Sequence, residues 1–302
     1  MIRKIGINDR EYPKGLRNIY DPPKALYVNG SFSEQDAMAV AIVGSRRATL
    51  YGLEMSEKFG YELASHGITV VSGMARGIDS AAHRGALKAK GRTIAVMGSG
   101  HGHIYPPENA KLYKEIAAAG AVVTEFEDAE EPLAYHFPMR NRIISGLSLG
   151  VLVVEAAKDS GALITADLAA EQGREVFALP GKISSATSSG ANRLIKDGAR
   201  LVESVDDILE ELKITEIRPL AGAAKAKKDG EIARKTKAYV YNSLTEDERA
   251  VYRTLSDEPL YIDDIVNKAN VGLKKAADVL LKLQLKHLVR EMPGKQFVRK
   301  AG

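Results

Sequence analysis

The stretch from Ala39 to Ile78 constrains the fold of this chain most strongly. Two apolar runs of strand length, Ala39–Val43 and Ile68–Val71, each end in a turn of small residues, and a helical pattern lies between them. This is the pattern of a strand–helix–strand unit with parallel strands. Because such crossovers are right-handed, the turns that begin at Gly44 and Ser72 are expected at the same carboxyl edge of one sheet.

These two turns predict a phosphate site. Backbone N–H groups at the helix starts that follow such turns bind anions, and each turn also carries an arginine. The expected site therefore contains Gly44, Ser45, Arg46, Ser72, Gly73 and Arg76. The alternative is that the glycines only permit tight turns between a strand and a helix.

The same pattern continues to about residue 213. Strands are expected near Val40, Val70, Ile94, Val122, Leu152, Val176 and Leu201, with helical segments between them. Runs such as Val151–Val154 show no polar alternation, which is typical of a parallel sheet covered by helices on both faces. Residues 39–213 are therefore predicted to form an α/β domain with a mostly parallel sheet. Residues 1–38 form a lead-in that packs on this sheet, with a short strand at Ala25–Val28.

Composition changes after Lys213. Residues 214–242 lack periodicity and are rich in Ala and Lys, which predicts a basic linker, either a solvated tether or a contact for nucleic acid. Residues 243–302 show three helical segments and a hairpin around Pro293-Gly294, the pattern of a winged helix-turn-helix.

The third of these helices, Leu273–Leu285, is the candidate recognition helix. Its core face is expected to contain Leu273, Ala277, Leu280 and Leu281. Lys274, Lys275 and Lys282 then face outward beside Asp278, and we expect them to contact DNA. Contact with a protein is an equal alternative, because the acidic residues keep this face only mildly basic.

The cysteine count and charge exclude several protein classes. With no cysteine in 302 residues the chain has no disulfide framework, iron–sulfur cluster or thiolate zinc site. The N-terminal residues show no apolar run of signal-peptide or membrane-span length, so we expect a soluble cytoplasmic protein without a membrane partner. A net charge of +4 weakly favours an anionic partner.

Other patterns argue against a catalytic site, a metal site and a bound cofactor. The glycines of Gly98–Gly102 have the wrong spacing for dinucleotide binding, and the histidines show no convincing set of three ligands. Glu155, at the end of a buried strand, is a general base or a cap for a neighbouring helix start. No nucleophile lies at a suitable spacing from a base, so no catalytic residue is expected.

The segment Phe137–Gly146 places an aromatic residue and two arginines at the start of a helix that precedes a central strand. Stacking surface beside positive charge suits single-stranded nucleic acid. The expected DNA site therefore also contains Phe137, Arg140, Asn141 and Arg142, and Ser160 and Gly161 of the turn after Glu155 complete it. In the alternative interpretation, Phe137 is a hydrophobic staple and the arginines pair with helix-end carbonyls or with Glu155.

Together these motifs closely resemble the DNA-processing protein A family (DprA/Smf), over nearly the whole chain. The segments that carry the resemblance are Gly44–Arg46, Ser72–His83, Thr93–Gly100, Tyr105–Asn109, Phe137–Ser148, Val153–Gly181 and Gly190–Ala199. The resemblance implies a Rossmann-like domain that binds single-stranded DNA without cutting it, and that uses no cofactor. It also implies a homodimer that loads a RecA-type recombinase onto incoming DNA during natural transformation.

The resemblance assigns the family's DNA pocket to Arg46, Ser72-Gly73, Phe137, Arg140 and Arg142. Many members also carry an N-terminal helical domain of SAM type, for which about 38 residues before the sheet leave no room. The segment Glu130–His136 is acidic and aromatic and offers no basic residue to hold phosphate.

Two other functions remain open. A related Rossmann-like superfamily contains phosphoribohydrolases, which resemble one another in a PGGxGT loop with a glutamate, and Ser160–Thr165 lacks this loop. A winged-helix regulator that senses a nucleotide in the large domain is the other alternative, and a preference for palindromic duplex DNA is its expected property.

Overall fold

A computed structural model describes residues 2–214, 244–256, 259–286, 288–292 and 294–299. The chain divides into two compact units, Met1–Ala223 and Ala224–Gly302, and each is considered by itself. The expected linker, 214–242, lies outside the described residues except for Ile214, which is buried in the core of the first unit.

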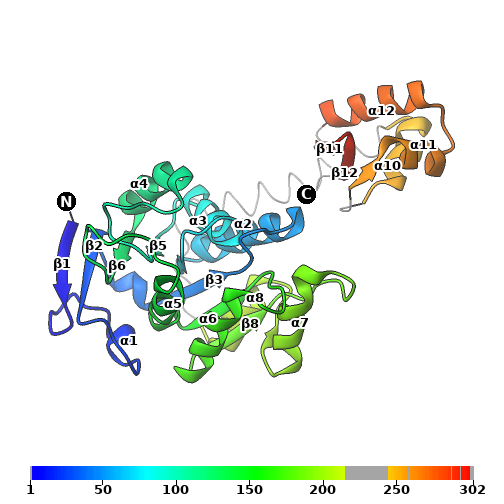
Figure 1. The fold of residues 1–302 in the computed structure, drawn as a ribbon. Helices are drawn as coiled ribbons and strands as arrows, with labels where there is room; N and C mark the ends of the chain where they lie inside the picture. The colour runs from blue at the N-terminus through cyan, green and yellow to red at the C-terminus, as the bar shows by residue number, and fades with distance from the viewer. Residues whose placement is uncertain (1, 215–243, 257–258, 287, 293, 300–302) are drawn as a thin grey trace. The chain divides into compact units, whose positions relative to one another are not determined.

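The first unit is built on a nine-stranded sheet with the order β1-β2-β6-β5-β4-β3-β7-β8-β9 (Figure 1). All the strands expected in residues 39–213 are present, and neighbours from β6 to β9 pair in parallel. These strands are β3 (Ala39–Val43), β4 (Thr69–Ser72), β5 (Thr93–Val96), β6 (Ala121–Thr124), β7 (Gly150–Val153), β8 (Glu175–Ala178) and β9 (Arg200–Leu201). Because β3 lies between β4 and β7, the strand order reverses at β3, and ligands of such sheets bind outside the carboxyl ends at this point.

Helices cover both faces of the sheet. One face carries α2 (Leu50–Ser65), α3 (Ile78–Lys88), α4 (Ala110–Ala119) and α8 (Val205–Glu211), and the other carries α5 (His136–Gly146), α6 (Gly161–Glu171) and α7 (Ser189–Lys196). Three short 3-10 turns complete this unit: Glu34–Ala37, Pro107–Asn109 and Ala186–Ser188.

Strand β3 shows how the sequence specifies this arrangement. Its alternate residues belong to different cores: Ala39, Ala41 and Val43 pack with α5 and α6, whereas Val40 and Ile42 pack with α2 and α3. Each fully buried Val or Ile side chain contributes roughly 1.5–3 kcal/mol. A parallel strand buried on both faces needs an apolar residue at every position, and the fold is the Rossmann-like sheet expected from the sequence.

The lead-in differs from expectation, because it extends the sheet. β1 (Ile2–Gly6) and β2 (Ala25–Gly30) form an antiparallel pair, and β2 pairs antiparallel with β6. The short helix α1 (Lys14–Arg17) lies between β1 and β2 in the sequence. β1 escapes sequence analysis because it is an edge strand whose first three residues are exposed and include Arg3 and Lys4, so no apolar pattern marks it.

The second unit contains the helices and hairpin of a winged helix. Its elements are α10 (Glu246–Thr254), β10 (Leu260–Tyr261), α11 (Ile262–Ala269), α12 (Leu273–Leu285), β11 (Val289–Met292) and β12 (Gln296–Arg299). α10 begins at a capping box, in which Thr245 N donates to Glu248 Oε2 at 2.9 Å and Glu248 N donates to Thr245 Oγ1 at 3.3 Å. The short strand β10, which pairs with β12, was not expected from the sequence.

The expected core face of α12 is largely wrong. The helix buries Ala276, Val279, Leu280 and Leu283, whereas Leu273 and Leu281 are 55% and 56% exposed and Ala277 is exposed as well. α12 carries two apolar rows, and its sequence alone cannot choose between them. The outward face is also less basic than expected, because Lys275 pairs with Asp247 at 2.7 Å and Lys282 with Asp278 at 3.5 Å.

In the part of the chain that the structure describes, no helix is long and apolar enough to cross a membrane.

Candidate nucleic-acid interface

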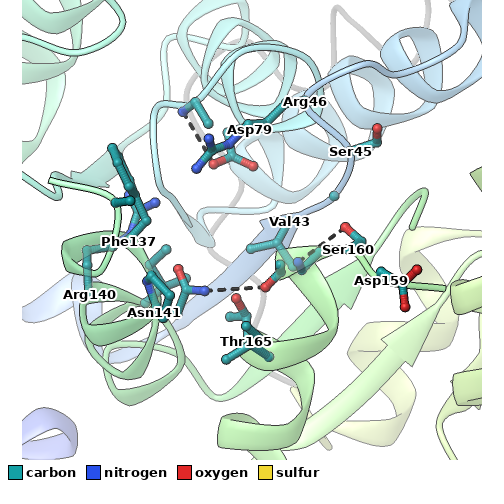
Figure 2. Close-up of a pocket in the computed structure, with 18 of the residues that line it drawn as sticks. Val43, Ser45, Arg46, Asp79, Phe137, Arg140, Asn141, Asp159, Ser160 and Thr165 are labelled. Carbon is teal, nitrogen blue, oxygen red and sulfur yellow. Dashed lines mark hydrogen bonds between the residues drawn. The ribbon is translucent and has the colours of Figure 1, made fainter. Parts of the chain in front are cut away.

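A pocket of about 730 Å³ lies where the strand order reverses. It is lined by the end of β3 and the starts of α5 and α6, with Tyr105 and Asp79 at its sides. Figure 2 shows Phe137, Arg140 and Asn141 on one side and Ser160 and Asp159 on the other, with Val43 between them. Eight expected site residues line this pocket: Gly44, Ser45, Arg46, Phe137, Arg140, Asn141, Ser160 and Gly161.

The turn after β3 directs Arg46 outward. Ser45 N donates to Glu155 O at 2.8 Å, which fixes the turn against the end of β7. Residue 44 must be glycine, because a Cβ there would lie 2.7 Å from Ile78 Cγ1 and 2.8 Å from Glu155 O. The backbone is thus held tightly, whereas the Arg46 side chain is exposed.

A carboxylate of the protein caps the helix start that follows this turn. Glu155 is buried, and its carboxylate accepts hydrogen bonds from Thr49 Oγ1 and from Thr49 N, the latter at 2.9 Å. Thr49 is the N-cap of α2, so the alternative of Glu155 as a helix cap is confirmed. Glu155 therefore already occupies the N–H of the N-cap residue, and the expected phosphate contact through this helix start stays a prediction.

The second glycine turn is filled in the same way. Asp79 accepts hydrogen bonds from Gly73 N at 3.2 Å and from Ala75 N at 3.3 Å. Burial raises the pKa of this carboxyl, and the nearby Arg140 and Arg46 oppose the rise. Ser72, Gly73 and Arg76 do not line the pocket: Ser72 Oγ donates to Ile42 O, and the exposed Arg76 pairs with Glu108. Two N–H groups of the expected anion cradle are therefore already bonded to Asp79.

Arg140 forms part of the pocket floor. The side chain is buried, and its Nη1 donates to Gly73 O at 2.8 Å and also to Val96 O. Burial lowers the pKa of Arg140 to about 10, while Asp79 raises it and Arg46 lowers it further. Arg140 therefore joins the carboxyl ends of β4 and β5, and its partners are strand-end carbonyls rather than the helix-end carbonyls or the Glu155 carboxylate of the alternative interpretation.

Phe137 lies at the rim of the pocket. The Arg46 guanidinium carbon is 4.9 Å from the centroid of the Phe137 ring, and the Tyr105 ring centroid is 5.6 Å from it. The ring also packs on Gly98, where a Cβ would lie 2.9 Å from Phe137 Cδ1. Phe137 is the second residue of α5, whereas a staple residue precedes the N-cap, which is Tyr135 here, so Phe137 does not occupy the staple position.

The start of α6 forms the opposite wall. Ser160 is the N-cap and its Oγ accepts a hydrogen bond from Ala162 N at 3.3 Å, while Asn141 Nδ2 donates to Gly161 O at 3.3 Å. A Cβ on Gly161 would meet nothing within 4 Å, so this helix start is open toward the pocket. It offers the positive end of an 11-residue helix, although Asp159 lines the pocket beside it.

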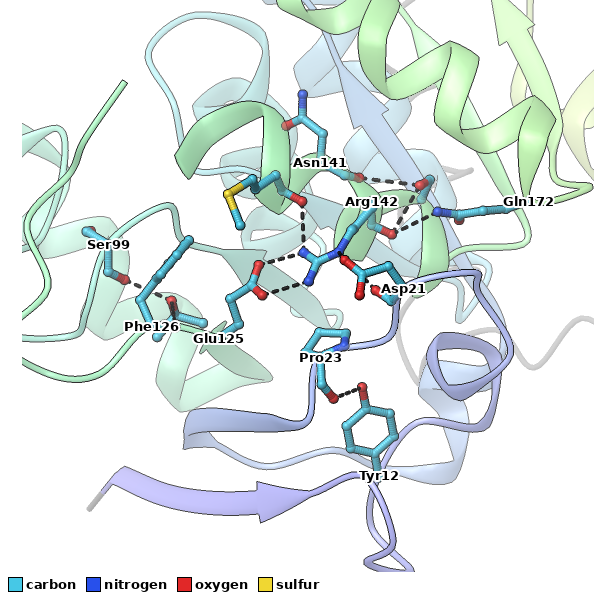
Figure 3. Close-up of polar contacts among 12 residues, drawn as sticks. Tyr12, Asp21, Pro23, Ser99, Glu125, Phe126, Asn141, Arg142 and Gln172 are labelled. Atoms are coloured by element: carbon cyan, nitrogen blue, oxygen red, sulfur yellow. Dashed lines mark hydrogen bonds and ion pairs between the residues drawn. The ribbon is translucent and has the colours of Figure 1, made fainter. Parts of the chain in front are cut away.

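Arg142 lies outside this pocket, and its guanidinium is bonded to other residues of the protein. Its Nη1 and Nη2 donate to the two carboxylate oxygens of Glu125 at 2.6 and 2.7 Å, and its Nε donates to Asp21 O at 2.9 Å (Figure 3). Asp21 belongs to the lead-in, and Glu125 follows β6. Arg142 therefore ties the lead-in to the sheet, and its guanidinium is not directed at the candidate site.

A hydrogen bond within the lead-in joins two of its segments near this arginine (Figure 3). Tyr12 is buried, and its hydroxyl donates to Pro23 O at 2.8 Å. Burial raises the pKa of Tyr12 to about 12, so the phenol stays neutral over the whole physiological range.

Sequence reasoning missed several residues of the pocket. Asp79 and Tyr105 lie within the segments Ser72–His83 and Tyr105–Asn109, but neither was assigned to the site, and Asp159 and Thr165 were not identified either. The available signal was position for Asp79, Tyr105 and Asp159, which lie in a turn or at a helix start at the carboxyl edge, whereas Thr165 lies within α6. Among the described residues, no group of three His, Cys, Asp or Glu side chains is arranged to hold a metal ion.

Comparison with known proteins places this architecture in a family. Residues 3–213 match the family model described as DNA recombination-mediator protein A, and residues 236–295 match the DprA winged helix domain. The chain belongs to the DNA recombination-mediator protein A family.

Relatives of known name agree with this assignment. DNA processing protein DprA of Bacillus subtilis is 44% identical over 212 residues, which cover 70% of this chain and 71% of that protein. Protein Smf of Escherichia coli is 50% identical over 203 residues, which are 67% of this chain but only 54% of that protein. The chain thus spans about half the length of the Escherichia coli relative.

Two solved structures of this DprA family share the fold of the large unit. One is DNA processing protein A from Streptococcus pneumoniae, with 44% identity and a TM-score of 0.67 over 70% of this chain and 74% of that one. The other is from Helicobacter pylori, with 30% identity and a TM-score of 0.62 over 70% and 95%. The description of the latter concerns its single-stranded DNA binding mode.

Proposed function

We propose that this protein is a single-stranded DNA-binding recombination mediator and that the pocket at the β3–β7 reversal is its DNA site. The observation that carries the proposal is the meeting of Arg46 and Phe137 at the pocket rim, with 4.9 Å between the guanidinium carbon and the ring centroid. A cation for phosphate and an aromatic ring for a base are the two elements that single-strand binding requires.

The pocket residues divide between these two tasks. Arg46 is the exposed arginine of the lining and contacts a phosphate, helped by the open start of α6. Phe137 and Tyr105 stack on bases, and the pocket volume of about 730 Å³ is ample for one. Because the lining also contains Asp79 and Asp159, it is not strongly positive, and stacking supplies much of the affinity.

The wider role rests on family membership. We propose that the protein acts as a homodimer in the cytoplasm, protects incoming DNA and loads a RecA-type recombinase onto it during natural transformation. Support comes from the family description as a recombination mediator and from the Helicobacter pylori relative, whose description names single-stranded DNA. No reaction is assigned to the pocket, and the winged helix adjusts binding by contact with DNA or protein.

Fluorescence anisotropy with the full chain tests the DNA site. Labelled single-stranded oligonucleotides of increasing length, a matched duplex and free nucleotides are titrated at several salt concentrations. Single strands are expected to bind in preference to duplex, with weak sequence preference and with affinity that falls as salt rises. Equal or tighter binding to duplex contradicts the proposal and favours the winged-helix regulator.

A further inference from the structure

Arg46 and Phe137 contact each other at the rim of the pocket. The guanidinium carbon lies 4.9 Å from the ring centroid, within the range of a cation–π interaction. Phosphate binding requires that guanidinium to face the DNA backbone, and base stacking requires a free face of the ring. A base that stacks on the covered face of the ring must therefore displace the guanidinium from it.

The other neighbours of Phe137 cannot move away so readily. Arg140 has its guanidinium carbon 6.0 Å from the ring centroid, but it is only 4% exposed and bonded to two strand-end carbonyls. Gly98 packs on the ring through its backbone, and Tyr105 lies at a tilt of 50°. Arg46 is exposed, and besides the ring its guanidinium interacts electrostatically with Asp79, so among these neighbours it is the one that can leave the ring.

We propose that Arg46 covers Phe137 in the free protein and moves to a phosphate when DNA binds, which makes the pair a selector for phosphate-linked bases. The inference rests on the proposed single-strand site. A base that arrives with its phosphodiester gives the guanidinium a new, charge-assisted partner as it uncovers the ring. A neutral base or nucleoside uncovers the ring without any replacement for the lost contact. The site therefore discriminates against uncharged ligands.

The size of this discrimination follows from the contact that is lost. Cation–π contacts at exposed positions correspond to about a two- to fivefold change in affinity. The loss of this contact lowers the affinity of every ligand that stacks on Phe137 by that factor. The gain in affinity from phosphate binding by Arg46 must be larger than this loss.

A double-mutant cycle on the full chain tests the proposal. The affinity for a labelled single-stranded oligonucleotide is measured for the natural protein, Arg46→Ala, Phe137→Ala and the double variant, with thermal unfolding as a check on folding. If Arg46 covers the ring only in the free state, Phe137→Ala weakens binding about two- to fivefold more in the Arg46→Ala background than in the natural one. An equal or smaller loss in that background overturns the inference, because Arg46 and Phe137 then act independently or together on bound DNA.

A neutral ligand gives a second readout. Arg46→Ala is expected to bind a methylphosphonate oligonucleotide, whose backbone is uncharged, about two- to fivefold more tightly than the natural protein, while it binds the natural oligonucleotide more weakly. Arg47→Ala is the matched control, since Arg47 is an exposed arginine in the same turn. Weaker or unchanged binding of the neutral oligonucleotide by Arg46→Ala contradicts the inference. Phe137→Leu replaces Phe137→Ala if the alanine variant does not fold.

These outcomes separate the inference from the proposed function. If the natural protein fails to bind the single strand at all, the proposed function is wrong. If it binds, and loses affinity on Arg46→Ala, but the cycle shows the opposite sign, only the covering role of Arg46 is wrong.

Discussion

Glu155 and Thr49 are 106 residues apart in the chain, yet the Glu155 carboxylate accepts hydrogen bonds from both the backbone N–H and the hydroxyl of Thr49. This contact joins the end of β7 to the start of α2 across the point where the strand order reverses. It also places a negative charge at the helix start where the glycine turn predicted a phosphate. In the proposed DNA site, phosphate binding is therefore assigned to Arg46 and the start of α6.

Replacement of Glu155 is expected to reduce stability. In Glu155→Gln, a neutral amide replaces the charged cap of α2, and the buried hydrogen bonds weaken, so the free energy of unfolding falls by about 1–3 kcal/mol. Urea unfolding measures this change. Asp159→Asn is the control, since Asp159 is an exposed carboxylate in the same pocket and should alter stability by less than about 0.5 kcal/mol. Unchanged stability in Glu155→Gln would show that the cap is not what this carboxylate supplies.

Replacement of Arg142 is expected to lower stability without changing DNA affinity, and replacement of Arg46 is expected to do the reverse. Arg142→Ala leaves Glu125 without its bidentate partner and detaches Asp21, so the free energy of unfolding falls by roughly 3 kcal/mol. The folded fraction keeps its affinity for single-stranded DNA, because Arg142 lies outside the pocket. Arg46→Ala keeps its stability and loses affinity. Urea unfolding and anisotropy on both variants measure the two effects, and a folded Arg142→Ala protein with reduced affinity would return this arginine to the DNA site.

The sequence predicted the fold well because its signals are local. Apolar runs without alternation, such as Ala39–Val43, mark buried parallel strands, and the glycine turn at Gly44 marks the carboxyl edge. The partners of side chains are not local. Nothing in the sequence near Arg142 indicates Glu125 or Asp21, because these contacts depend on how separate segments meet. Asp79 is only six residues from Gly73, but its position in the sequence does not show that its carboxylate turns back onto the N–H groups of that turn. The prediction of the core face of α12 was wrong for another reason. The helix has two apolar rows, and its packing against α10 and α11 determines which of them is buried.

Adjacent leucines of α12 offer a direct test of that correction. Leu280 is 1% exposed and packs in the winged-helix core, whereas Leu281 is 56% exposed. Leu280→Ala should lower the free energy of unfolding of this domain by about 2–5 kcal/mol, and Leu281→Ala should change it by less than about 0.5 kcal/mol. Amide hydrogen exchange of the full chain resolves this domain from the other. Equal losses for both leucines would restore the face expected from the sequence.

His83 is expected to make stability depend on pH. Burial lowers the pKa of His83 from 6.5 to about 3, so the unfolded chain takes up a proton at higher pH than the folded one. The contribution of His83 is complete above pH 6.5 and decreases as pH falls toward 3, by about 1.4 kcal/mol per pH unit. Asp79, whose pKa burial raises, contributes with the opposite sign. The measurement is therefore the slope of the free energy of unfolding against pH, from pH 7 to 4.5, for the natural protein and for His83→Gln. Equal slopes for the two proteins would contradict the role of His83.

Binding by the large unit alone should show how few phosphate contacts the pocket makes. Residues 1–214 contain the complete sheet, its cores and every pocket residue, so this fragment is expected to retain most of the single-strand affinity.

Of the two arginines in the lining, Arg140 is buried and bonded to carbonyls, and only Arg46 is exposed. Arg46→Ala should therefore lower the slope of log affinity against log salt by about one unit, whereas Phe137→Ala costs about 1–3 kcal/mol and leaves the slope nearly unchanged, because it removes stacking and no phosphate contact. Anisotropy titrations of the fragment at several salt concentrations measure both quantities. If the fragment does not bind while the full chain does, residues outside the large unit hold the DNA, and an Arg46→Ala fragment with unchanged affinity and slope would remove this arginine from the site.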